Sequence, residues 1–481
     1  MNKKFYITTT LPYVNADPHI GFALEVIQAD TIARFQRQAG CQVIYNTGTD
    51  EHGLKIFQKA CEQKKDPQSY CNEYAQKFNN LKSAFNLSYT HFIRTTDKHH
   101  IQAAQEFWRL CDKNGDIYKK NYEIRYCVGC ELEKTDSELV DGYCSLHPGK
   151  KLEMIKEENY FFRFSAYQDK LLKLFKDNPH FVVPDFRLKE IIAFVKKGLE
   201  DFSVSRLKSK MPWGIDVPGD PNHVMYVWFD ALINYVSTLG WPNDKQRFAD
   251  FWGTHHNPNA IQIAGKDNLR QQSAMWQAML MSAGLPNSKK IFIHGFITAN
   301  GQKMSKSLGN VVDPFALVDR FGTDAVRYYL LREIPTFTDG NYSEKRFIEI
   351  YNADLANDLG NLVARLEKLC VTNNIIIPID NKKLEIPHQL IQNGFLIHLN
   401  NYEFCLALEE LWKEIKIINF EINKEKPWEK PIAVEETIKN WVGRLRNISY
   451  ALKPFLPDTA EKILRAFQGS TTVSPLFPRI S

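Results

Sequence analysis

The sequence predicts an α/β protein in which an insertion splits a doubly wound parallel sheet and an all-α helical bundle follows. Three observations favour this architecture. Short apolar runs alternate with amphipathic helical stretches over residues 1–112, as βαβ units do. The alternation stops at a cysteine-rich stretch and resumes at about residue 223. Beyond residue 345 the strand signals nearly vanish, and long periodic helices remain.

Length and composition agree with an ordinary protein of several domains. A chain of 481 residues is too long for one core and indicates two to four domains. No apolar run reaches the roughly 18 residues that cross a bilayer, and the N-terminus has no signal-peptide core. We therefore expect a cytoplasmic protein with no membrane partner. Nine cysteines, five of them scattered without a motif, favour reduced thiols over a framework of disulfides. The net charge of +5 permits a polyanionic partner without requiring one.

The changes in pattern divide the chain into five segments. Two halves of the sheet domain flank the insertion, and a loop-rich segment connects the second half to the bundle. In chain order the predicted segments are 1–112 (first half of the sheet domain), 113–222 (insertion), 223–297 (second half), 298–344 (connecting segment) and 345–481 (helical bundle).

The turn between the first expected strand (5–11) and the first expected helix reads Pro-His-Ile-Gly-Phe, residues 18–22. A helix N-terminus presents unpaired N–H groups and a partial positive charge, so it can bind an anion. Gly21 would let a ligand approach the backbone, and His19 could donate a hydrogen bond to a phosphate. Taken alone, the motif agrees equally well with a capped turn that carries an incidental histidine.

A second motif, Lys303-Met304-Ser305-Lys306, lies in a Gly- and Ser-rich loop after an expected strand at Ile291–His294. Two ammonium groups there could neutralise a triphosphate as charge develops in a transition state. By itself, a solvated basic loop is the simpler interpretation. The combination with the turn at residues 18–22, in a chain of this organisation, favours phosphate binding.

Two pairs of metal-binding residue types lie in the insertion. Cys127 and Cys130 are separated by two residues, and so are Cys144 and His147. Such pairs can place soft donors at the corners of a tetrahedron, so we expect a structural Zn²⁺ rather than four unrelated side chains. Because protein would fill all four positions, the metal should hold the insertion together and take no part in chemistry.

The two motifs at residues 18–22 and 303–307 together closely resemble the signature sequences of class I aminoacyl-tRNA synthetases. More specifically, the segments LPYVNADPHIG, NTGTDEHG, YVWFDA, GKD and KMSKSLGNVVDP, in this order, are similar to the methionyl-tRNA synthetase family. The resemblance extends from about residue 5 to the helical bundle. It implies a Rossmann-type catalytic domain, a connective insertion with a zinc knuckle, a lysine loop with a tRNA-stem-contact region at 298–344, and a helical anticodon-binding domain.

The resemblance also implies roles for individual residues. Catalysis, by stabilising the α-phosphate transition state and the pyrophosphate, would fall to His19, Lys303 and Lys306. Contacts to ATP would come from His19, Gly21, Gly265, Asp267 and Lys306. Asp50 would hold the α-ammonium group of the amino acid. The amino-acid pocket would be lined by Leu11, Tyr13, Trp228, Ala231 and Tyr235, together with Asn268 and Gln272. Without the family pattern, Trp228 and Tyr235 would be interpreted as core aromatics.

The bundle carries nearly equal numbers of basic and acidic residues, so RNA recognition there would depend on particular side chains. Asn361 and Arg365 are four residues apart and share a helical face. Trp428 follows a helix-breaking proline and could stack on an unpaired base, or it could fill a gap between helices. The family match favours anticodon contact, because matching Asn, Arg and Trp residues read the CAU anticodon of methionine tRNA in the family.

Four positions depart from the family pattern. Phe22 stands where a second signature histidine is usual, and Leu232 stands where proline or a small residue is common. Asn268 and Gln272 replace an apolar residue and a histidine at the pocket wall. Amides beside an apolar thioether pocket would cost free energy unless they are paired. We expect that these two bond to each other or to Tyr13, or that the pocket accepts a more polar amino acid.

The expected function is therefore that of a methionine--tRNA ligase. L-methionine, ATP with Mg²⁺ and methionine tRNA, both initiator and elongator, would be its partners, and we expect a monomer. Two alternatives remain: a synthetase-like enzyme with another amino-acid or acceptor specificity, and a non-catalytic paralogue that binds RNA. The presence of His19, Asp50 and Lys306 speaks against the second alternative.

Overall fold

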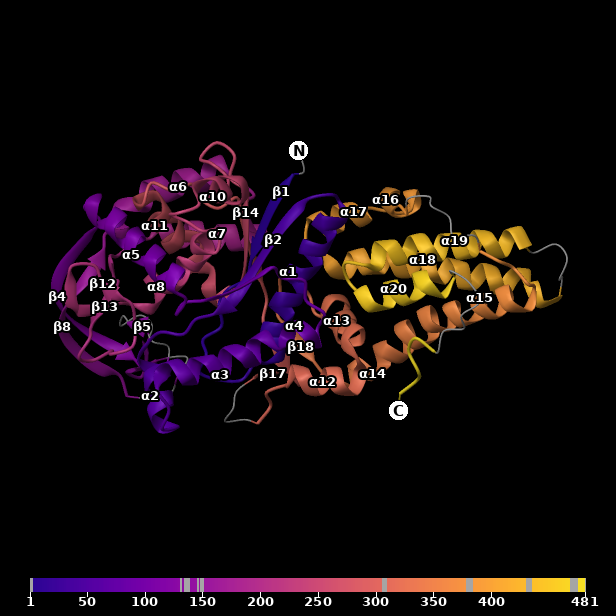
Figure 1. The fold of residues 1–481 in the computed structure, drawn as a ribbon, viewed down its shortest axis with the longest axis horizontal. Helices are drawn as coiled ribbons and strands as arrows, with labels where there is room; N and C mark the ends of the chain where they lie inside the picture. The colour runs from indigo at the N-terminus through magenta and orange to yellow at the C-terminus, as the bar shows by residue number, and fades with distance from the viewer. Residues whose placement is uncertain are drawn as a thin grey trace.

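The structure is a computed structural model. It describes residues 3–129, 132–133, 139–144, 147, 151–304, 309–377, 384–429, 435–467 and 475–480. An α/β body forms one end of an elongated molecule, and a bundle of long helices forms the other (Figure 1). Within the described ranges, no helix is long and apolar enough to cross a bilayer.

A parallel sheet of six strands forms the centre of the α/β body. Its strands are β1 (Lys4–Thr8), β2 (Gln42–Thr49), β3 (His91–Arg94), β9 (Val182–Val183), β14 (Ala260–Gly265) and β15 (Lys290–His294). The spatial order is β3-β2-β1-β14-β15-β9, and all neighbouring pairs are parallel. Strands β2 and β3 are therefore added on one side of β1, and β14 and β15 on its other side, so the strand order reverses between β1 and β14. Open parallel sheets bind ligands at such a reversal, beyond the carboxyl ends of the strands.

The first strand and helix form as predicted, with one difference in length. The strand expected over 5–11 ends at Thr8, and α1 runs over Ile20–Gln38. The chain leaves the sheet early because its next residues bond to the segment after β2. The N–H of Asp50 donates to Pro12 O at 3.0 Å, and the N–H of Val14 donates to Asp50 O at 3.1 Å.

Helices cover both faces of the sheet, and each face has its own apolar core. One core contains α1 and continues without a break into the helical bundle. The other lies beneath the helices that flank the insertion. The helices of the α/β body are α2 (Leu54–Glu62), α3 (Pro67–Asn79), α4 (Leu81–Ala84), α5 (Lys98–Lys113), α8 (Val227–Leu232), α9 (Asn234–Ser237), α10 (Lys245–Trp252) and α11 (Trp276–Ser282).

The insertion is built on a long antiparallel ribbon of β4 (Ile117–Cys127) and β8 (Glu153–Phe162). This confirms the strand pattern at 118–126. The strand β9 also falls in the predicted segment 113–222, yet it pairs with β15 at the edge of the central sheet. The remaining elements of this segment are β5 (Leu132–Glu133), β6 (Leu139–Val140), β7 (Tyr143–Cys144), α6 (Gln168–Asp177), α7 (Asp185–Lys196), β10 (Phe202–Ser203), β11 (Ser205–Leu207), β12 (Asp216–Val217) and β13 (Asp220–Met225).

A small sheet connects the body to the bundle. In it, β16 (Ile297–Ala299) pairs with β17 (Gln302–Lys303) in an antiparallel hairpin and with β18 (Gly340–Tyr342) in parallel. The helices α12 (Pro314–Phe321) and α13 (Thr323–Arg332) lie between these strands in sequence. The hairpin places the start of the lysine loop beside the carboxyl ends of the central strands.

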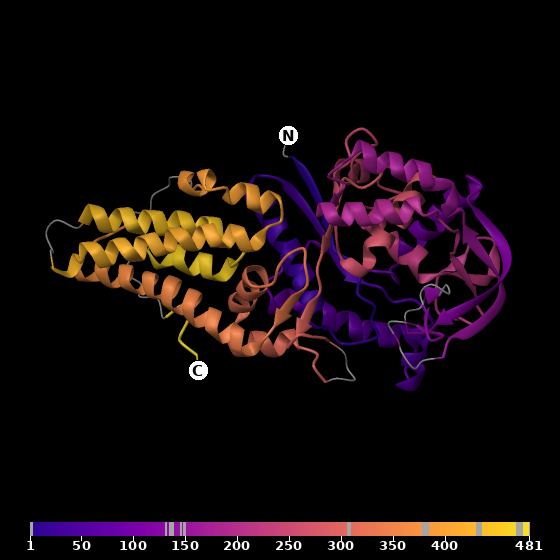
Figure 2. The ribbon, with the colours of Figure 1, turned by 180° about the vertical axis from the view of Figure 1, so that it is seen from behind.

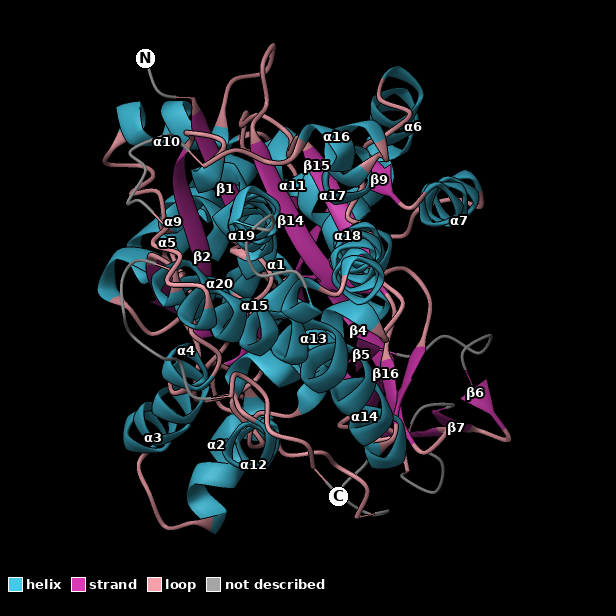
Figure 3. Cartoon of the chain, turned by 90° about the vertical axis from the view of Figure 1, so that its right-hand side faces the viewer, coloured by secondary structure: helices cyan, strands magenta, loops and turns pink. Residues whose placement is uncertain are grey.

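The bundle contains the long helices expected beyond residue 345. Figure 2 shows one extended helical segment running along its lower side from the α/β body to the far end. This segment consists of α14, a π-helix (Tyr351–Gly360) and α15 in succession. Viewed along the long axis, the bundle helices stand in front of the central sheet (Figure 3). The bundle helices are α14 (Glu344–Ile350), α15 (Asn361–Thr372), α16 (His388–Gln392), α17 (Phe395–Asn400), α18 (Phe404–Glu425), α19 (Glu435–Leu452) and α20 (Pro457–Ala466).

Candidate active site

A cavity of about 920 Å³ opens at the carboxyl ends of the central strands, where the strand order reverses. Its volume suits a ligand of nucleotide size. The cavity brings together twelve of the residues that the sequence predicted for substrate binding. They are Leu11, Tyr13, His19, Gly21, Asp50, Trp228, Ala231, Tyr235, Gly265, Asp267, Asn268 and Gln272.

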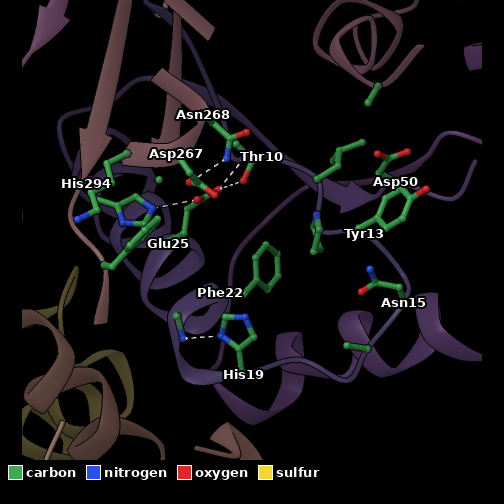
Figure 4. Close-up of a pocket in the computed structure, with 18 of the residues that line it drawn as sticks. Thr10, Tyr13, Asn15, His19, Phe22, Glu25, Asp50, Asp267, Asn268 and His294 are labelled. Atoms are coloured by element: carbon green, nitrogen blue, oxygen red, sulfur yellow. Dashed lines mark hydrogen bonds and ion pairs between the residues drawn. The ribbon is translucent and has the colours of Figure 1, made fainter. Parts of the chain in front are cut away.

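The labelled side chains fall into two groups on opposite sides of the cavity (Figure 4). Asp267 and His294 lie on one side, and Tyr13 and Asp50 lie on the other. Phe22 and His19, at the start of α1, lie between the two groups. The first side therefore corresponds to the expected nucleotide contacts, and the second to the expected amino-acid contacts.

His19 caps the N-terminus of α1. Its backbone is extended, and its Nδ1 accepts a hydrogen bond from the N–H of Gly21 at 3.1 Å. The ring is open to the cavity, but the surrounding protein removes enough water to lower the pKa of His19. Near neutral pH the ring is therefore neutral, and its proton lies on Nε2 because Nδ1 is an acceptor. His19 can thus donate one hydrogen bond to an anion at the helix N-terminus.

Gly21 is needed for the position of His19. A Cβ at residue 21 would lie 2.9 Å from His19 Cε1 and 3.0 Å from His19 Nδ1. Any side chain would therefore push the imidazole away from the helix terminus. The sequence predicted that Gly21 lets a ligand approach the backbone. The structure shows a second role, because the absence of a Cβ at residue 21 also leaves space for the His19 ring.

Phe22 packs against another aromatic ring. It makes an edge-to-face contact with Phe78 of α3, with ring centroids 5.4 Å apart and planes at 83°. Both rings line the cavity. Phe22, which stands where the family signature usually has histidine, therefore has an apolar partner. A phenylalanine at this position also carries no polar group that would need a hydrogen bond.

An acidic and a basic side chain meet at the nucleotide side, and sequence reasoning missed both. Glu25 accepts hydrogen bonds from the N–H and hydroxyl of Thr10 at 2.7 and 2.6 Å. Its other oxygen lies 2.9 Å from His294 Nε2, while His294 Nδ1 lies 2.7 Å from Gly295 O. Burial alone would lower the pKa of His294, but the bond and charge of Glu25 outweigh it and raise that pKa. The signal available was a glutamate one turn after Gly21, on the helix that the motif begins.

Asp50 is buried at the end of β2, and an isolated parallel bridge pairs its backbone with Tyr13. Two residues later, His52 Nδ1 lies 2.6 Å from Asp230 Oδ2, and His100 Nε2 lies 2.7 Å from Asp230 Oδ1. Burial alone would raise the pKa of Asp230. The two histidines have the larger effect and lower that pKa, so the carboxylate is ionised. This buried cluster ties the segment that carries Asp50 to α8, which carries Trp228.

The two amides at the pocket wall pair neither with each other nor with Tyr13, so that prediction was wrong. Gln272 Nε2 donates to Tyr235 Oη at 2.7 Å, and Gln272 Oε1 accepts from Gln262 Nε2 at 3.3 Å. Asn268 Nδ2 donates to Asp267 Oδ1 at 3.2 Å. Each amide therefore has its own partner, and neither leaves an unsatisfied group facing an apolar side chain.

The lysine loop begins at the edge of the cavity. The backbone of Lys303 pairs with Thr298 in the hairpin, and Met304 lines the cavity. Lys306 lies outside the described residues. The position of the hairpin at the cavity edge is therefore the structural support for the predicted contact between this loop and the phosphates of ATP.

Three of the four predicted metal ligands lie close together. The ligand atoms of Cys127, Cys144 and His147 all lie within 4.8 Å of one another. His147 Nδ1 is 3.8 Å from Cys127 Sγ and 4.0 Å from Cys144 Sγ, and a tetrahedral zinc site needs about 3.6 Å between such atoms. A Cβ at Gly129 would lie 2.6 Å from the His147 ring, so the turn between the first two cysteines requires glycine. These residues fit a structural zinc ion, and Cys130 lies outside the described residues.

The predicted RNA-binding residues share one surface of the bundle. Asn361 is exposed at the start of α15. Arg365 donates to Asn423 Oδ1 at 2.7 Å, and its guanidinium carbon lies 5.9 Å from the centroid of the Trp428 ring. Trp428 is 57% exposed, so it does not fill a gap between helices. An exposed indole beside a guanidinium is suited to stacking on a base.

Comparison with known proteins gives consistent results. The family model described as "tRNA synthetases class I (M)" matches residues 5–148 and 130–367. The methionine--tRNA ligase of Thermotoga maritima is 41% identical, and the alignment covers 96% of this chain and 75% of the relative. That of Thermosynechococcus vestitus is 42% identical, with 96% and 90% covered. Among solved structures, Mycobacterium tuberculosis methionyl-tRNA synthetase in complex with methionyl-adenylate superposes with a TM-score of 0.88 at 38% identity, covering 96% of this chain and 93% of that one.

Proposed function

The chain belongs to the methionyl-tRNA synthetases of class I, and from this premise we propose which of its residues carry out each part of the reaction. The activity is that of a methionine--tRNA ligase, which uses ATP. In the first step the carboxylate of methionine attacks the α-phosphate of ATP and releases pyrophosphate. In the second step the terminal ribose hydroxyl of the tRNA attacks the carbonyl of the methionyl-adenylate.

The observation that best supports the proposal is the single cavity that holds both expected substrate sites. ATP would lie on the side of Gly265 and Asp267, with its phosphates toward the N-terminus of α1. Methionine would lie on the side of Asp50, whose side-chain carboxyl group would pair with the α-ammonium group. The carboxylate of methionine would then face the α-phosphate across His19.

Activation needs charge stabilisation more than covalent chemistry. His19 would donate its Nε2 proton to a phosphate oxygen, and the dipole of α1 would add its partial positive charge at the helix N-terminus. Lys303 and Lys306 would neutralise the departing pyrophosphate. The hairpin β16–β17, which carries the backbone of Lys303, leads directly to Met304 in the cavity lining. Mg²⁺ would arrive bound to the phosphates of ATP.

Recognition of methionine tRNA would fall to the far end of the bundle. Asn361, Arg365 and Trp428 present amide, guanidinium and indole groups on one surface. We keep the five predicted segments as part of this proposal, and residues 345–481 would form the anticodon-binding domain. Zn²⁺ held by Cys127, Cys130, Cys144 and His147 would stabilise the insertion.

We also propose that the protein is a monomer and acts in the cytoplasm. The cavity is formed within one chain, and so is the surface around Trp428. The cytoplasmic location follows from the use of aminoacylated tRNA in translation. Size-exclusion chromatography with light scattering tests the monomer directly.

Aminoacylation of methionine tRNA with a native and an altered anticodon tests the assignment of the bundle. We expect methionylation of the native tRNA and a loss of at least a hundredfold in kcat/KM when the CAU anticodon is changed. Equal rates with both tRNAs would contradict the role of the bundle surface.

A further inference from the structure

A buried ion pair lies directly behind the amino-acid side of the cavity. Arg94, the last residue of β3, donates from Nε to Glu51 Oε1 at 2.6 Å and from Nη2 to Glu51 Oε2 at 2.8 Å. Glu51 follows Asp50 in the chain, and its side chain is fully buried. Asp50 lines the cavity, whereas Glu51 and Arg94 do not. The pair is therefore adjacent to a predicted substrate contact without touching the cavity itself.

Two hydroxyl groups add to the hydrogen bonds of the Glu51 carboxylate. The Thr49 hydroxyl donates to Oε1 at 2.6 Å, and the Thr96 hydroxyl donates to Oε2 at 2.5 Å. Each oxygen thus accepts two hydrogen bonds, as a carboxylate requires when it is buried. Burial alone would lower the pKa of Arg94, but the hydrogen bonds and charge of Glu51 outweigh it and raise that pKa, so the guanidinium stays charged. The planar, two-bonded contact allows one geometry, so the Glu51 side chain is held firmly.

The backbone that follows Asp50 is held as well. The N–H of Glu51 donates to Thr95 Oγ1 at 2.9 Å, and its carbonyl oxygen accepts from Trp213 Nε1 at 2.5 Å. The N–H of Gly53 donates to Trp213 O at 3.0 Å. Trp213 lies in the insertion, between β11 and β12. Residues 51–53 are therefore fixed between the end of β3 and the insertion.

These contacts set the direction of the Asp50 side chain. Asp50 continues the line of β2 in its parallel bridge with Tyr13, and successive side chains of an extended segment point to opposite sides. Because Glu51 is anchored toward β3, Asp50 faces the cavity, where it lies beside Tyr13 (Figure 4). We propose that Arg94 is a positioning residue for the amino acid: by holding Glu51, it fixes the angle at which Asp50 meets the α-ammonium group.

This inference rests on the proposed function, because it requires that Asp50 binds the α-ammonium group. Two inhibitors isolate that contact. L-methioninol carries the ammonium group, and its deaminated analogue, methylsulfanylbutanol, has the same chain without it. Neither has a carboxylate, so neither can be activated. The ratio of their inhibition constants in ATP–pyrophosphate exchange, analogue over L-methioninol, therefore measures the preference for the ammonium group.

Arg94→Met removes the guanidinium and leaves the Glu51 carboxylate buried without its ionic partner. A buried charge that loses its partner forces its surroundings to rearrange, so Asp50 should move. We expect the ratio to fall about three- to thirtyfold, within the worth of one hydrogen bond to a charged group. The KM for methionine should rise by a similar factor, and the KM for ATP should stay at the native value. A loss of folded protein alone would lower kcat and leave the ratio and both KM values unchanged.

Glu51→Gln tests the same contact with almost no change in volume. One carboxylate oxygen becomes an NH₂ group, which cannot accept a hydrogen bond from the guanidinium. The two-bonded contact with Arg94 is thereby reduced to a single bond. The ratio should fall, but by less than in Arg94→Met, so this variant decides the question if Arg94→Met does not fold.

Arg34→Met is the matched control. Arg34 of α1 donates from Nε to Asp30 Oδ2 at 2.7 Å. Its side chain is 21% exposed, against 24% for Arg94, and the carboxylate partner is fully buried in both pairs. Arg34→Met therefore also leaves a buried carboxylate without a partner, but away from Asp50. It should leave the ratio and the KM for methionine at their native values.

Asp50→Asn separates a failure of this inference from a failure of the proposed function. It should remove most of the preference for L-methioninol. If it does so while folded Glu51→Gln and Arg94→Met proteins keep the native ratio, Arg94 does not position Asp50 and the inference is overturned. A native ratio in Asp50→Asn itself would instead contradict the assignment of the ammonium group to Asp50.

Discussion

His19 and Gly21 act as one unit, because each depends on the other. The ring of His19 accepts from the Gly21 N–H, and the space for that ring exists only because residue 21 has no Cβ. This contact orients the Nε2 proton toward the cavity. The interaction could not be derived from the motif alone, since spacing shows which residues are neighbours and not which of them collide.

Gly21→Ala should therefore disable activation without unfolding the protein. The new Cβ displaces the imidazole by a fraction of an ångström or more, and such misplacement costs about a hundredfold in rate. ATP–pyrophosphate exchange measures the effect. Gly443→Ala is the control, because a Cβ there meets nothing within 4 Å and the residue lies inside α19; exchange should stay at the native rate. Similar losses in both variants would refute the collision with His19.

The pH dependence of activation should report on His19. Because its pKa is lowered, the ring is neutral near neutral pH and becomes charged only as the pH falls through that lowered value. Protonation of Nδ1 ends the bond from Gly21, so kcat/KM for ATP should fall below that pH. His19→Asn keeps a donor but has no titration there, and its profile should lack this acidic limb. The same acidic limb in His19→Asn would assign the titration to another group.

At the scale of elements, alternating pattern and length predicted the strands and helices that are long. The helix α1 and the strands β2 and β15 formed where expected. The two-residue strand β9 was missed, because so short a segment has no periodicity to detect. The π-helix over Tyr351–Gly360 was missed as well, since its pattern differs little from that of an α-helix.

The zinc knuckle should bind one metal ion and lose it when a ligand is removed. Purified protein should contain about one zinc per chain, measured by mass spectrometry of the metal. Cys127→Ser should lose the ion and unfold the insertion at a lower temperature. Cys61→Ser is the control, because Cys61 is an exposed free cysteine on α2. Native protein that lacks metal, or a Cys127→Ser protein that retains it, would contradict this site.

Trp428 should contribute to the second reaction step and leave the first unchanged. Loss of one base-stacking contact costs about 1–3 kcal/mol, so Trp428→Ala should lower kcat/KM for tRNA by roughly five- to 150-fold. ATP–pyrophosphate exchange should stay at the native rate. Phe186→Ala, which removes an exposed aromatic ring from α7, should affect neither assay. Unchanged aminoacylation in Trp428→Ala would remove this residue from the RNA surface.

At the scale of the whole molecule, Arg327 of α13 connects the catalytic body to the bundle. It is fully buried and donates to the carbonyl oxygens of Phe455, Pro454 and Phe85 at 2.7, 3.0 and 3.1 Å. It also lies 2.9 Å from Asp30 of α1. Burial would raise the pKa of Asp30, but Arg327 and its other neighbours lower it, so this pair is ionised. One side chain thus holds α1, α13 and the bundle in a fixed arrangement.

Arg327→Lys should lower the free energy of unfolding by about 2 kcal/mol, because an ammonium group cannot reach all these acceptors in the geometry of a guanidinium. Chemical denaturation measures this. Arg346→Lys is the control: Arg346 is about half exposed on α14 and pairs with Glu333, and its replacement should change stability by less than about 0.5 kcal/mol. Equal effects at both positions would show that Arg327 does not connect the two parts.

How much of the site could be predicted depends on the distance in sequence between the partners. Asp50 and Asp267 were predicted because each lies in a recognisable segment at a strand end. The contacts Gln262–Gln272–Tyr235 and Glu25–His294 join segments that only the folded sheet brings together. Composition and spacing carry no information on such pairs. The prediction that Asn268 and Gln272 bond to each other or to Tyr13 failed for this reason.

The central claim is that this cavity activates methionine. ATP–pyrophosphate exchange with the native protein, measured for all twenty natural amino acids under one condition, tests it most directly. We predict that methionine has the highest kcat/KM, and that the more polar amino acids are activated at least a hundredfold less efficiently. A more polar amino acid as the best substrate, or no exchange with any amino acid, would contradict the account.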